Sequence, residues 1–149
     1  MPARRAPAHV RRAGSVSLVT RAPIRWELLP LVCAGGAIGV AARHVLTALV
    51  PDGSVVWMTA VINVVGSLLL GFVAGVCGAR HARWRGFLGT GVLGGFTTYS
   101  AFAVQVAGAT PGPQIALVLA GSALLVILAV GAALAGLVVG ARVARGAAA

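Results

Sequence analysis

Hydroxyl and aromatic residues interrupt an uncharged apolar run over residues 86–109. The interruption reads Gly94, Gly95, Phe96, Thr97, Thr98, Tyr99, Ser100, Ala101 and Phe102. A glycine pair followed by adjacent hydroxyls and aromatics is a poor continuous helix. Irregular backbone inside a membrane persists only where it is buried in protein or lines a polar path. We therefore expect a helix break here, at a site that binds or conducts something.

A second polar stripe precedes this stretch. Thr59, Asn63, Ser67, Gly71 and Gly75 are spaced four residues apart, so they share one face of a helix. An amide near the middle of a membrane is costly unless it has a partner, and the Asn63 NH2 group offers two donors to an anion. The same amide is also suited to joining two helices. The residues alone leave both roles open.

The apolar runs lack acidic residues. The two carboxylates of the chain are Glu27, at the edge of a run, and Asp52, in a turn. Proton-coupled exporters and cation paths place an acidic side chain inside the membrane, whereas hydroxyls, an amide, aromatic edges and Arg43 suit an anion. Tyr99 and Phe102 are three residues apart, so on one face of a resumed helix they would present positive ring edges to a small anion. Ordinary packing is the alternative for this pair.

The elements that position these residues are membrane helices. Of the 149 residues, 59% are hydrophobic and 9% are charged, which predicts an all-α integral membrane protein. A span needs roughly 20 apolar residues. Four runs meet this length, at about residues 28–50, 55–76, 86–109 and 115–141, with a break in the third. The short turns between them predict a compact bundle over residues 28–141.

The chain has a net charge of +10, and all its arginines except Arg43 lie outside the four apolar runs. We expect a disordered basic arm over residues 1–27 and a short basic tail over residues 142–149. Basic residues beside spans orient a chain and attract anionic lipid, and they lack the interleaved aromatics of a nucleic-acid surface. Since the arm, the loop over residues 78–85 and the tail fall on one side, we expect both termini in the cytoplasm of a cell-membrane protein.

Glycines recur at spacings that let helices approach closely. Gly71 and Gly75 form one such pair, and Gly136 and Gly140 form another. Small residues four apart are typical of membrane helix contacts. The spacing fits packing within the chain or an interface between subunits.

Three motifs resemble the Fluc/CrcB fluoride channels in order and spacing. They are residues 35–39 with Arg43, residues 63–67 with Gly71, and residues 94–102. The resemblance covers about residues 28–141. It implies a fluoride channel that exports the toxic anion passively and is not an enzyme. It also implies an antiparallel dimer of four-helix subunits with two pores, and a structural sodium ion held by backbone carbonyls at Gly94 and Thr97.

The same resemblance assigns a set of pore residues and a vestibule arginine, Arg43. The expected fluoride contacts are Asn63, Thr98, Tyr99, Ser100, Phe102 and Ser122. Four positions depart from the family pattern. They are Tyr99 in place of phenylalanine, Ala101 in place of threonine, Gln105 in place of glutamate and Val118 in place of asparagine.

These departures and the charge pattern leave alternatives. The second subunit of the dimer is either another copy of this chain or an oppositely oriented homologue. A non-conducting subunit of a heteromeric fluoride channel fits the pore departures. A small multidrug-type antiporter is the other four-span class, and it would need a carboxylate within the membrane.

Overall fold

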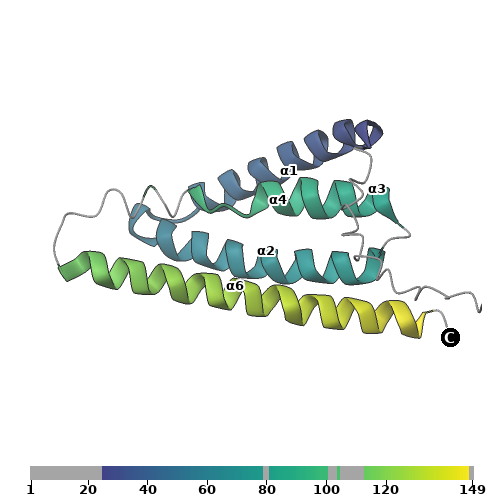
Figure 1. Ribbon diagram of the computed structural model, residues 1–149. Helices are drawn as coiled ribbons and strands as arrows, with labels where there is room; N and C mark the ends of the chain where they lie inside the picture. The colour runs from purple at the N-terminus through teal and green to yellow at the C-terminus, as the bar shows by residue number, and fades with distance from the viewer. Residues whose placement is uncertain (1–24, 79–80, 101–103, 105–112, 148–149) are drawn as a thin grey trace, which may run out of the picture.

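The computed structural model is all-helical over the residues that it describes, namely 25–78, 81–100, 104 and 113–147 (Figure 1). Its elements in chain order are η1 (Trp26–Leu28), α1 (Leu29–Ala48), η2 (Asp52–Ser54), α2 (Val55–Cys77), α3 (Ala82–Trp84), the π-helical η3 (Arg85–Leu93), α4 (Gly94–Phe96) and α6 (Pro113–Gly146). Most of the expected basic arm, residues 1–24, and residues 148–149 of the tail lie outside the described residues.

Within the described residues, three helical stretches are long and apolar enough to cross a membrane, namely Trp26–Ala48, Asp52–Cys77 and Ile115–Gly146. The multi-pass membrane protein predicted from composition is thereby confirmed. The 34 residues of α6 span about 51 Å, against roughly 30 Å for a hydrocarbon core. The helix is therefore longer than the apolar layer is thick, and Arg142 and Arg145 lie in its last turns. Residues 101–103 and 105–109 of the third predicted run lie outside the described part of the chain.

The helices lie side by side, with α1 against η3 and α4, and α2 against α6 (Figure 1). Glycines make the second of these contacts. A Cβ added at Gly71 or Gly75 would overlap the α6 backbone, and one added at Gly136 or Gly140 would overlap the α2 backbone. Of the two roles that the spacing allowed for these four glycines, the structure assigns packing within the chain.

The helical backbone of the third region ends after Phe96. Thr97 is extended, with φ −77° and ψ 147°, and its N–H donates to the carbonyl oxygen of Leu93 at 3.0 Å. Helical structure returns at Ser100. Gly94 and Gly95 are themselves helical, and Gly95 packs closely against the Gly36 backbone of α1. Gly95 thus serves helix contact, while the irregular backbone follows the glycine pair.

The glycine contacts predict a sharp difference between two substitutions on α6. Gly136→Ala forces the backbones of α2 and α6 apart, and overpacking of this kind costs about 1–3 kcal/mol. Gly131→Ala is the matched control, because a Cβ there meets no atom within 4 Å. Thermal unfolding in detergent should show a lowered Tm for Gly136→Ala alone. Equal Tm values for the two variants would contradict close packing at Gly136.

Candidate functional site

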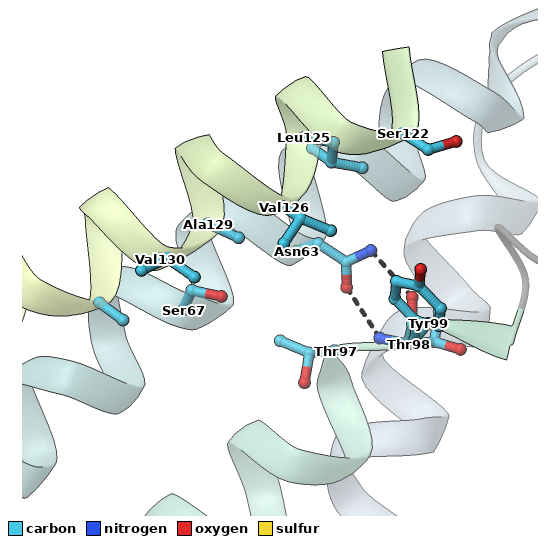
Figure 2. A pocket seen from close by; sticks show the side chains of 11 residues that line it. Asn63, Ser67, Thr97, Thr98, Tyr99, Ser122, Leu125, Val126, Ala129 and Val130 are labelled. Atoms are coloured by element: carbon cyan, nitrogen blue, oxygen red, sulfur yellow. Dashed lines mark hydrogen bonds between the residues drawn. The ribbon is translucent and has the colours of Figure 1, made fainter. Parts of the chain in front are cut away.

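A cavity of about 350 Å³ lies between α2, α6 and the irregular segment after α4 (Figure 2). Polar side chains from α2 and the segment face apolar side chains of α6. The lining residues are Asn63, Ser67, Thr97, Thr98, Tyr99, Ser122, Leu125, Val126, Ala129, Val130 and Ala133. The structure thus brings together four of the predicted contacts, namely Asn63, Thr98, Tyr99 and Ser122.

Asn63 is bonded to the backbone of the irregular segment. Its Nδ2 donates to the carbonyl oxygen of Thr98 at 2.9 Å, and the Thr98 N–H donates to its Oδ1 at 2.8 Å (Figure 2). In a continuous helix the Thr98 N–H would donate to the carbonyl of Gly94. The Asn63 amide therefore joins two segments 35 residues apart. One of its two amide hydrogens is engaged in this way, and the other is left for a ligand.

The hydroxyls around the cavity are bonded in different ways. Thr98 Oγ1 and Ser100 Oγ are 3.0 Å apart and form a pair. Ser122 Oγ donates to the carbonyl of Val118 at 2.6 Å, within its own helix. The predicted Ser100 is therefore tied to the site through Thr98, although it does not line the cavity itself.

The structure describes one of the two predicted aromatics. Tyr99 lies in the irregular segment, just before helical structure returns at Ser100, and the residue is 71% exposed. Phe102 lies outside the described residues, so the predicted pairing of the two rings stays a prediction.

Arg43, on α1, contacts α4 and does not line the cavity. Its Nε donates a long hydrogen bond, of 3.5 Å, to the carbonyl oxygen of Gly95 in α4. A cation beside the last carbonyls of a helix interacts favourably with the helix dipole. Arg43 thus contacts protein backbone near the irregular segment.

Sequence reasoning did not assign Ser67 or the apolar wall to the site. Ser67 follows Asn63 by one helical turn, so its place in the polar stripe was the available signal. The wall formed by Val126, Ala129 and Val130 carries no such signal, because small apolar side chains are common throughout membrane helices.

The family profile described as CrcB-like protein, Camphor Resistance (CrcB), matches residues 30–141. The chain belongs to the CrcB family. The matched region includes every residue that lines the cavity.

Several curated CrcB relatives carry the name fluoride-specific ion channel. FluC 1 of Rhodococcus jostii (strain RHA1) is 52% identical over 75 residues, which are 50% of this chain and 57% of the relative. FluC 2 of Leifsonia xyli subsp. xyli (strain CTCB07) is 49% identical over 85 residues, 52% of this chain and 59% of the relative. FluC 2 of Thermobifida fusca (strain YX) is 39% identical over 104 residues, 64% and 77% of the two chains. The chain spans little more than half the length of the first two.

The bonds between Asn63 and Thr98 predict faster amide exchange in an Asn63→Ala variant. Each bond contributes about 1 kcal/mol, so protection of residues 97–100 should fall roughly thirtyfold when both are lost. Hydrogen–deuterium exchange of the purified protein measures this. Ser122→Ala is the control, because its hydroxyl bonds only α6. Unchanged exchange in Asn63→Ala would show that Asn63 does not hold the segment.

Proposed function

We propose that this CrcB-family chain is a subunit of a fluoride-selective channel that exports cytoplasmic fluoride passively and lowers its toxicity. The observation that carries the proposal is the cavity, where an amide and hydroxyls meet irregular backbone. Fluoride holds its water tightly, so a pore must replace that water with hydrogen-bond donors. The relatives named as fluoride-specific ion channels support the choice of anion.

Both carboxylates of the chain lie away from the cavity. Glu27 is in η1 and forms an ion pair with Arg25, and Asp52 begins η2 between α1 and α2. A multidrug-type antiporter needs a carboxylate that binds its cation within the membrane. The placement of both acids therefore favours the anion channel over that alternative.

In the proposed pore, fluoride contacts the remaining amide hydrogen of Asn63, the hydroxyls of Thr98, Ser100 and Ser122, and the ring edges of Tyr99 and Phe102. For its contact, the Ser122 hydroxyl turns its hydrogen from the Val118 carbonyl to the ion. Arg43 adds positive potential beside this path. The cavity geometry supports Asn63, Thr98, Tyr99 and Ser122 directly, because all four line it. The proposal for Phe102 depends on the family resemblance alone.

We also propose four spans with a break in the third, and a structural sodium ion at the break. The end of helical backbone at Phe96 supports the break. The proposed sodium ligands are the carbonyl oxygens of Gly94 and Thr97. Carbonyl oxygens suit a hard cation, and an extended Thr97 turns its carbonyl away from the helical direction. The donor set therefore fits sodium.

The placement of arginine indicates how the chain is oriented, and the orientation limits what the second subunit of the proposed dimer can be. Apart from Arg43, the arginines in the described residues lie at the end of the bundle where α1 begins and α6 ends (Figure 1). They are Arg25, Arg83, Arg85, Arg142 and Arg145. Basic residues remain cytoplasmic, so we place both termini on the cytoplasmic side of the cell membrane. An antiparallel dimer then needs an oppositely oriented homologue, or a second copy that inserts the other way.

Reconstitution into liposomes tests the proposed function. Two preparations are compared, one with the protein alone and one with the protein together with an oppositely oriented homologue. At least one of them should release trapped fluoride, as measured with a fluoride electrode. Chloride should stay inside, because the larger ion does not fit a path built for fluoride. No fluoride release from either preparation, or equal release of both anions, would contradict a fluoride-selective channel.

A tag at the C-terminus tests the orientation. Since the arginines gather at one end, the tag should be found only on the cytoplasmic side of intact cells, as judged by its protection from external protease. Permeabilised cells provide the control for cleavage. Tags found on both sides of the membrane, together with full fluoride release from this chain alone, would contradict the heterodimer and favour a homodimer of dual orientation.

A further inference from the structure

The cavity differs in character along its length. At one end Asn63, Thr98 and Ser122 bring an amide and hydroxyls together, and towards the other end α6 presents alanines and valines (Figure 2). The glycine contacts fix the alignment of the two helices there. Because Gly71 packs against Ala133, Ser67 on the preceding turn of α2 is level with about Ala129 on α6.

Two of the hydroxyls that line the cavity already donate to backbone. A hydroxyl has one hydrogen to donate, and those of Thr97 and Ser122 go to the carbonyls of Leu93 and Val118. The Ser67 hydroxyl, in contrast, has no hydrogen-bond partner among the described residues. Within the described part of the chain, every buried side-chain oxygen or nitrogen has a hydrogen-bond partner. Because the Ser67 oxygen has none, it is not buried. The hydrogen of Ser67 is therefore available to a ligand in the cavity.

We infer that Ser67 is an additional anion-contacting residue, which accepts the ion from Asn63 and carries it past the apolar wall of α6. The inference rests on the proposed function and extends it to a residue outside the predicted contacts. Four residues of helix correspond to about 6 Å, so the ion moves a short step from one donor to the next. If Ser67 were absent, a dehydrated anion beside Ala129 and Val130 would meet no free hydrogen-bond donor among the described residues. This would be costly, because the anion would be an unpaired charge in apolar surroundings.

Ser67→Ala tests this inference in the liposome preparation that conducts. Fluoride release should fall roughly 10-fold to 100-fold, as expected when an ion loses a charge-assisted hydrogen bond. Thr59→Val is the matched control. It removes a hydroxyl from the same stripe of α2, but Thr59 bonds the Val55 carbonyl and does not line the cavity. Its fluoride release should match that of the wild type.

A rescue variant separates the loss of a donor from a change in packing. Ala129→Ser combined with Ser67→Ala returns a hydroxyl to the same level from the opposite wall, and it should restore fluoride release. If Ser67→Ala does not fold, Ser67→Cys repeats the test, because a thiol is a weak donor of similar size.

Wild-type release from Ser67→Ala, or from Ser67→Cys where that variant replaces it, would overturn the role of Ser67 and leave the proposed function intact. So would a loss that Ala129→Ser does not restore. A wild-type protein that passes no fluoride in either preparation would overturn the proposed function, and the role of Ser67 with it.

Discussion

The paired hydrogen bonds between the Asn63 amide and the Thr98 backbone are the interaction on which the cavity depends. A chain that leaves its helix inside a membrane exposes N–H and carbonyl groups, and lipid offers them no partner. Asn63 supplies both partners to one residue, as a neighbouring strand would. The segment can therefore remain irregular, and its hydroxyls and Tyr99 stand beside α2 and α6.

Close helix packing determines where that amide stands. With Gly71 and Gly75 on α2, and Gly136 and Gly140 on α6, the two backbones touch on one side of the cavity. Van der Waals contact is the main attraction between membrane helices, so this touching surface stabilises the pair and fixes its alignment. Towards Asn63 and Ser67 the facing residues are larger than glycine, and the cavity lies there.

The sequence predicted features that depend on local pattern. The α1 and α2 boundaries fall within two residues of the predicted spans, because apolar runs end at polar turns. It also placed irregular backbone within residues 94–102, where the extended Thr97 lies. It did not predict that Gly94 and Gly95 are helical, because the packing partner of Gly95, Gly36, lies far away in the chain. The partner of Asn63 was hidden for the same reason, since Thr98 is 35 residues away.

The irregular segment also separates charge in a way that suits an anion. The last carbonyls of α4 form the negative end of a helix dipole, which would repel an anion nearby. Arg43 reaches one of them, that of Gly95, from α1, while the cavity lies towards α2 and α6 (Figure 1). The guanidinium thus offsets the negative helix end from the side away from the cavity. Towards the cavity the protein presents N–H and O–H groups from Asn63 and Ser67. An anion there meets hydrogen-bond donors, and two carbonyls of this region, those of Gly95 and Thr98, are engaged by Arg43 and Asn63.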